Sequence, residues 1–179
     1  MAEKRKKNSR KAYLNDIRLN ESGKYAYQGY YYCFTGDEAE RKKAYRALWL
    51  LLMANIAVAV ASGCLSGAGI TNTFYVIIPY IGEMSAIFAL AWNHVKLLTK
   101  GEEIREYIYR SAHDKMPVAA MLTAFFAIVG AVLSLVFSVS TGFRDGVGNA
   151  VAYLLLKVAS ATVALIYRNY FSKLEWIKV

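Results

Sequence analysis

Two charged residues of opposite sign, Glu83 and Lys157, interrupt long apolar stretches of this sequence. A charged side chain at the centre of a lipid bilayer costs roughly 2.5 to 3.5 kcal/mol on insertion scales, so such residues face polar partners rather than lipid. An acid and a base placed in this way can hold each other as an ion pair. They can also form part of a path along which an ion or a proton crosses a membrane.

The positions of these two residues predict that they meet. If the chain crosses a bilayer four times, both stretches run inward from the outer surface. Glu83 lies about ten residues and Lys157 about eight residues from the start, so both are roughly 12 to 15 Å deep at 1.5 Å per residue. The side chains expected to support the pair are Asn55, Tyr80, Tyr153 and Ser160.

Pro79 precedes Glu83 by one helical turn and lacks a backbone N–H, so it is expected to kink its helix toward the outer end. A kink beside a buried carboxylate suits an ion or proton site in a transporter. Alternatively, the pair fixes the helix bundle or is completed by a charge of another subunit, or one of the side chains reaches the membrane surface. The sequence leaves these alternatives open.

Other residues give little sign of chemistry. The sequence lacks the nucleophile elbow, the zinc-protease motif, the phosphate-binding loop and paired cysteines, so we expect no enzymatic activity, no cofactor and no metal. His94 and His113 should lie on the same side of a membrane, but two histidines without a ligand motif are typical of interfacial polar residues. Cys33 and Cys64 should lie on opposite sides, so no disulfide between them is expected.

Four apolar stretches predict an all-α, polytopic membrane protein with four transmembrane helices arranged as two antiparallel hairpins. Each stretch is long enough to cross a hydrocarbon core of about 30 Å at 1.5 Å per residue. Short, glycine-rich connectors after the first and third stretches favour the hairpins. The expected spans are 45–64, 73–98, 116–140 and 149–167.

Lysine and arginine predict the orientation of these spans. The amino-terminal segment, counted through Arg46 at the start of the first span, contains 12 of them. The first connector contains none, the middle connector with its flanks five, the last connector one and the tail three. Cytoplasmic loops are enriched in these residues, so we expect both termini and the middle connector in the cytoplasm. Residues 1–44 and 168–179 are then cytoplasmic segments on either side of a membrane domain, 45–167, which lies in the inner membrane if the protein is bacterial.

The net charge of +9 does not predict nucleic-acid binding, because the basic residues lie mainly at the start of the chain and beside the spans. The basic cluster at 4–11 is expected to attract anionic lipid headgroups. Each well-placed basic residue contributes about 1 kcal/mol to such attraction.

Rows of small residues at helical spacing predict where the spans pack closely, because small side chains let helix backbones approach each other in lipid. The longest row lies in the third span and consists of Ala120, Ala124, Ala127, Ala131, Ser134 and Ser138. Shorter rows lie in the second span, at Gly82, Ala86, Ala89 and Asn93, and in the first, at Ala54, Ala57, Ala61 and Cys64. The longest row could serve this chain's own bundle or a partner's helix.

The polar segments also carry structural signals. The tyrosine-rich segment 25–34 favours an extended or interfacial conformation, either among lipid headgroups or against the ends of the protein's own helices. A helix is expected to begin at Thr35 or Asp37, since either residue can cap it. Charge and apolar spacing over 102–110 predict a short amphipathic helix.

These features favour a small non-enzymatic subunit, or partner-binding component, of a membrane assembly. Its expected partners are membrane lipid and another membrane protein or a second copy of itself. The alternative is an oligomeric ion-coupled transporter or channel that uses Glu83 and Lys157, because four spans alone seldom enclose a path.

Overall fold

The computed structural model describes residues 17–19, 25–27, 29–65, 73–99 and 101–179. Four long helices dominate it: α2 (Glu38–Gly63), α3 (Phe74–Leu98), α5 (Lys115–Ser140) and α6 (Val147–Ser172), with a short helix α4 (Glu106–His113) before α5. These are longer than the predicted spans at several ends, because α2 begins before 45 and α6 continues past 167. All four long helices are long and apolar enough to cross a membrane.

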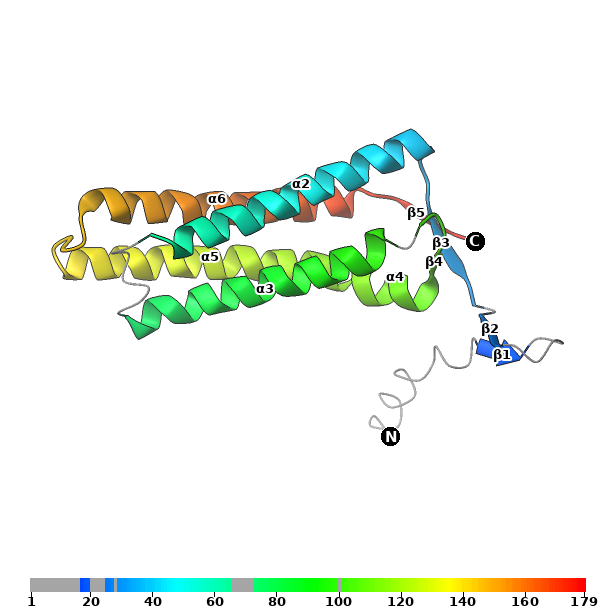
Figure 1. Ribbon diagram of the computed structural model, residues 1–179, viewed down its shortest axis with the longest axis horizontal. Coiled ribbons are helices and arrows are strands. Elements are labelled where there is room, and N and C mark those ends of the chain that lie inside the picture. The colour runs from blue at the N-terminus through cyan, green and yellow to red at the C-terminus, as the bar shows by residue number, and fades with distance from the viewer. Residues whose placement is uncertain (1–16, 20–24, 28, 66–72, 100) are drawn as a thin grey trace.

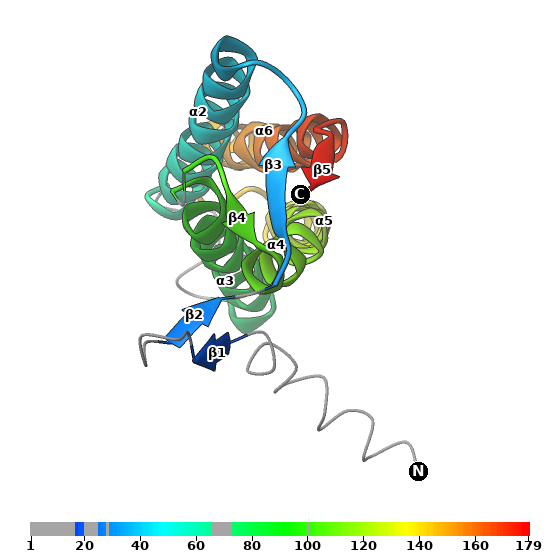
Figure 2. The ribbon, with the colours of Figure 1, turned by 90° about the vertical axis from the view of Figure 1, so that its right-hand side faces the viewer.

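The long helices alternate in direction and lie side by side (Figure 1). α5 packs extensively against both α3 and α6, whereas α2 packs mainly against α6 and much less against α3. The expected hairpin of the first two spans is therefore not the main packing unit. α2 crosses the bundle at an angle, and its first turns stand away from α3 (Figures 1 and 2).

Asp37, one of the two capping residues that the sequence offered, caps α2. Its carboxylate accepts a hydrogen bond from the backbone N–H of Glu40 at 2.6 Å, which satisfies one of the free donors of the first turn. Glu38 and Glu40 lie in that turn, where negative charge suits the helix dipole.

The all-α prediction is incomplete, because two small sheets accompany the helices. β1 (Ile17–Leu19) pairs with β2 (Tyr25–Tyr27), and the order of the second sheet is β4 (Ile104–Arg105), β3 (Tyr31–Phe34), β5 (Trp176–Lys178), all antiparallel. The second sheet lies across one end of the bundle, which we call the sheet end (Figure 2). The tail 168–179 is thus not a free extension: it completes α6 and then supplies an edge strand.

Aromatic side chains join this sheet to the helix ends. Tyr32 stacks on Tyr109 of α4 with ring centroids 4.1 Å apart, and Phe34 meets Trp176 edge to face at 6.0 Å. Within the described residues, Tyr31–Phe34 therefore packs on the protein itself, while Tyr30 is more than half exposed.

The helix predicted over 102–110 begins later than expected. Ile104 and Arg105 extend to pair with β3, and α4 starts only at Glu106. Glu102 accordingly pairs with Arg41 of α2 at 2.6 Å, whereas Glu106 and Arg110, one turn apart in α4, pair at 2.7 Å. Strand pairing with β3 thus replaced the first helical turn.

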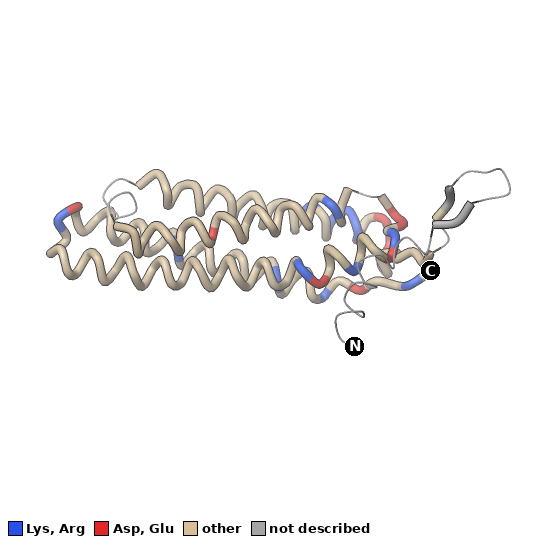
Figure 3. Tube along the Cα trace, turned by 90° about the horizontal axis from the view of Figure 1, so that it is seen from below, with Lys and Arg blue, Asp and Glu red and all other residues tan. Residues whose placement is uncertain are grey.

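Charged residues gather at the sheet end, and the helices are otherwise nearly free of them (Figure 3). The turn between α5 and α6 at the opposite end carries Arg144 and Asp145. Large apolar side chains cover the outer surface between these ends, including Leu50, Phe88 and Phe125, which are 71, 73 and 56% exposed. In the middle of the described bundle, Glu83 and Lys157 are the only Asp, Glu, Lys or Arg residues.

Candidate functional site

Glu83 of α3 and Lys157 of α6 form an ion pair in the centre of the bundle. The Nζ of Lys157 donates to Oε2 of Glu83, and neither side chain has any exposed surface. The two residues are 74 positions apart in sequence, so only the packing of α3, α5 and α6 brings them together. The depth match inferred from sequence thus corresponds to a direct contact.

Ser160 connects this pair to α2. Its hydroxyl donates to Oε1 of Glu83 at 2.6 Å and lies 3.2 Å from Oδ1 of Asn55. A serine has a single proton to donate, and the shorter contact to a carboxylate is the stronger one. Both carboxylate oxygens of Glu83 therefore have a donor within the chain, and three helices meet at one polar cluster.

Two tyrosine rings complete the surroundings of Lys157. Its Nζ lies 4.7 Å from the ring centroid of Tyr80 and 5.1 Å from that of Tyr153, within the range of cation–π attraction. The ammonium is thus held by one carboxylate and two aromatic faces. The hydroxyl of Tyr153 and the Nδ2 of Asn55 are buried and have no hydrogen-bond partner among the described residues.

The predicted helix kink at Pro79 stays a prediction. Pro79 is buried within α3, which continues without interruption from Phe74 to Leu98. Its Cβ faces α5 near Gly130, next to the pair rather than outside the bundle.

Two glycines belong to the same cluster and were missed by the sequence analysis. A Cβ on Gly63 would collide with the hydroxyl end of the Tyr80 ring, so this glycine lets the ring lie beside Lys157. A Cβ on Gly130 would sit 3.8 Å from Cε of Lys157, which is ordinary contact. A glycine inside an apolar helix indicates a close contact in the sequence, but the sequence does not show which side chain lies against it.

A second buried polar contact lies nearer the sheet end and was also missed. Nδ1 of His94 and the hydroxyl of Tyr167 are 2.7 Å apart, and both side chains are almost fully buried. The His94 ring also meets the ring of Trp49 edge to face at 4.4 Å. We expected an interfacial histidine, so the burial of His94 corrects that interpretation. The described residues contain no cluster of three or more metal-ligating side chains.

The small-residue row of α5 is buried inside the bundle. Each member is at most 7% exposed, and Ala124 and Ala127 pack against Ala161 and Ala164 of α6. The full row is Ala120, Ala124, Ala127, Ala131, Ser134 and Ser138. This face serves the chain's own packing, so it is not available to a partner's helix.

The small-residue row of α2 lies on the outside instead. Ala54, Ala57, Ala61 and Cys64 are all exposed, while the buried face of α2 consists of Ala44, Leu48, Leu52, Asn55, Ala59 and Ser62. In the second span the row is divided, since Ala86 and Asn93 are buried and Ala89 is exposed.

The fold and the buried pair define a class: a mostly helical protein with four candidate membrane spans around a small polar centre. Comparisons of the chain with protein-family models, with curated proteins and with solved structures find no match. Its function is therefore inferred from its own contacts.

Proposed function

We propose that this protein is a multi-pass membrane protein and a non-enzymatic component of a membrane assembly, which binds another membrane protein or a second copy of itself through the outward face of α2. Four apolar helices with an apolar outer surface support the membrane location. The gathering of lysine and arginine at the sheet end supports a cytoplasmic location for that end and for the carboxyl terminus.

The exposed row of small residues on α2 is the observation that carries the assembly role. Ala54, Ala57 and Ala61 stand at helical spacing on the side of α2 that faces away from the bundle. Helices in lipid associate where small side chains permit close backbone approach, and lipid-facing positions need no such residues. Of the four long helices, α2 also packs least against the rest of the described bundle, which leaves much of its surface uncovered.

In this proposal the Glu83–Lys157 pair stabilises the subunit itself. Its charges are satisfied within the chain, so no other subunit's charge is needed. Pairing in a dry interior also fixes the register of α3 against α6, because a shifted helix would leave both charges without partners.

Mild extraction from native membranes followed by size analysis tests the assembly role. We expect a complex larger than one 20.0 kDa chain with its bound lipid. Ala57→Leu combined with Ala61→Leu should convert this complex to a monomer, because the larger side chains prevent close helix approach. Phe88→Leu, an exposed change on α3, is the matched control and should leave the complex intact. A native chain that is monomeric both after extraction and after crosslinking in its membrane would refute the role.

A second candidate is an oligomeric ion-coupled transporter or channel, which the two buried groups without partners favour. Among the described residues, the Tyr153 hydroxyl and the Asn55 Nδ2 lack partners beside the charged pair. The hydroxyl oxygen can bind a passing cation or water, whereas the Nδ2, which only donates, can bind water or an anion. In reconstituted vesicles this candidate predicts that Glu83→Gln abolishes flux while the protein stays folded. Equal flux in the native protein, the variant and empty vesicles would exclude it.

A further inference from the structure

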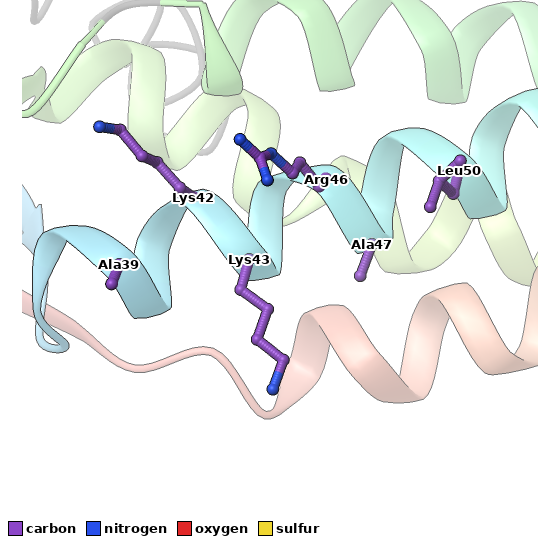
Figure 4. A pocket seen from close by; sticks show the side chains of 6 residues that line it. All are labelled: Ala39, Lys42, Lys43, Arg46, Ala47 and Leu50. Carbon is purple, nitrogen blue, oxygen red and sulfur yellow. The ribbon is translucent and has the colours of Figure 1, made fainter.

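A basic groove lies on the surface of α2 near the sheet end. It has a volume of about 460 Å³ and is lined by Ala39, Lys42, Lys43, Arg46, Ala47 and Leu50. Figure 4 shows Lys42 and Arg46 extending to one side of the helix and Lys43 to the other, with the short side chains of Ala39 and Ala47 at the surface of the helix. The two alanines leave the space, and the three long side chains form its walls.

The charges in this groove are not all neutralised by the protein. Lys42 forms an exposed ion pair with Glu38 at 2.6 Å. Lys43 and Arg46 are exposed, and neither has an acidic partner among the described residues. Two unneutralised cations three positions apart on one helix attract an anion, and the planar guanidinium of Arg46 suits two oxygens of a phosphate.

The groove continues into an apolar surface rather than into a polar one. Leu50 closes it on the side away from the sheet end and is 71% exposed, and Met53, one turn further, is 55% exposed. A soluble anion would gain nothing from these side chains. A molecule with a phosphate and an attached hydrocarbon chain would contact both parts.

We propose that this groove binds an anionic phospholipid, with the phosphate between Lys43 and Arg46 and an acyl chain along Leu50 and Met53. The proposal rests on the membrane location proposed above, which puts this part of α2 at the level of the cytoplasmic headgroups. Such binding differs from the general attraction of anionic lipid headgroups to the basic cluster at 4–11, because the lipid occupies one site with defined walls. A lipid held there would lie beside the outward small-residue row of α2 and so border the proposed partner face.

The test uses the full chain in detergent and counts bound lipids by native mass spectrometry, with phosphatidylglycerol or phosphatidylcholine added. We expect preferential retention of phosphatidylglycerol. Lys43→Gln combined with Arg46→Gln should weaken that binding roughly 30-fold, since each well-placed basic residue contributes about a fivefold effect. The matched control, Lys96→Gln with Lys115→Gln, removes two exposed charges from α3 and α5 and should leave binding unchanged.

Two further measurements identify the ligand and separate this proposal from the membrane location. Leu50→Gln should weaken lipid binding, and millimolar inorganic phosphate should not displace the lipid. Equal loss in both double variants, no loss in Lys43→Gln with Arg46→Gln, or displacement by free phosphate would each overturn the proposed site. Membrane fractionation of the same variants tests the location by itself: a chain that fractionates as soluble refutes the proposed function, whereas a membrane-bound chain without the lipid preference refutes only this site.

Discussion

The small-residue rows of α5 and α2 have the same helical spacing but opposite surroundings. On α5 the row is covered by α3 and α6, whereas on α2 it faces away from the other helices that the structure describes. The difference arises from the rest of each helix. α2 has a second, nearly opposite face, with Leu48, Leu52 and Asn55, that fills the bundle. Spacing therefore predicts a surface suited to close packing, but not the helix that packs on it.

The largest expected change in the free energy of unfolding comes from the buried Glu83–Lys157 pair, which lies beside α5. Lys157→Met leaves Glu83 charged and unpaired in a dry interior, so the free energy of unfolding should fall by about 3 to 5 kcal/mol. Thermal unfolding in detergent, followed by circular dichroism, measures this loss. A substitution at an exposed position on the outer face of α2, Ala54→Ser, should have almost no effect.

Glu83→Gln combined with Lys157→Met is the decisive control for that prediction. It removes both charges, so it should recover most of the stability lost by Lys157→Met. A double variant that is no more stable than the single one would show that the pair is not held by mutual attraction. Single variants that remain fully stable but lose vesicle flux would favour the transporter candidate instead.

The next largest difference is expected when an alanine of each row is replaced by the larger leucine. Ala127 has no exposed surface and contacts the alanines of α6, so Ala127→Leu should lower the free energy of unfolding by about 1 to 3 kcal/mol. Ala57→Leu adds the same atoms to an exposed position and should change it by less than about 0.5 kcal/mol. Denaturation of the two variants in parallel measures the difference. Equal losses would mean that α2 is buried by something outside this chain even in detergent.

The sequence predicted the helical elements and the pairing of the charges better than their surroundings. Helix positions follow from apolar length, and the pair follows from depth along two helices. The sheet could not be predicted in the same way, because Tyr31–Phe34, Ile104–Arg105 and Trp176–Lys178 are distant in sequence and each is too short to give a pattern. The buried His94 shows the same limit, since its partner Tyr167 is 73 positions away.

A smaller difference in stability is expected between alanine substitutions at the two glycines near the Glu83–Lys157 pair. Gly63→Ala would push the Tyr80 ring away from Lys157 and should cost about 1 kcal/mol. Gly130→Ala adds a methyl group at ordinary contact distances inside α5, so it should stabilise the protein by about 0.4 to 1 kcal/mol through the lower entropy of the unfolded chain. The unfolding midpoints of both variants test this. A loss for Gly130→Ala as large as that for Gly63→Ala would show that the cluster has no free space on the α5 side.

The smallest expected effect on stability concerns the two cysteines, which also probe the outward row directly. Cys64 is exposed at the end of the α2 row, whereas Cys33 is only partly exposed in β3. Burial, and to a smaller extent the negative charge of Glu103, raises the pKa of the Cys33 thiol. A raised pKa lowers the thiolate fraction at neutral pH, so Cys33 should react more slowly than an unhindered thiol. Replacing Cys64 by serine should leave the unfolding midpoint unchanged.

Mild oxidation in native membranes then distinguishes two kinds of assembly. If a second copy of this chain covers the α2 row, Cys64 should form a disulfide-linked dimer that disappears in Cys64→Ser and persists in Cys33→Ser. If another membrane protein covers the row, Cys64 should be protected from a membrane-permeant maleimide and become reactive once Ala57→Leu with Ala61→Leu disrupts the contact. Rapid labelling of Cys64 in the native membrane without any dimer would mean that the row faces lipid, and the contrast between α5 and α2 would then have no role in assembly.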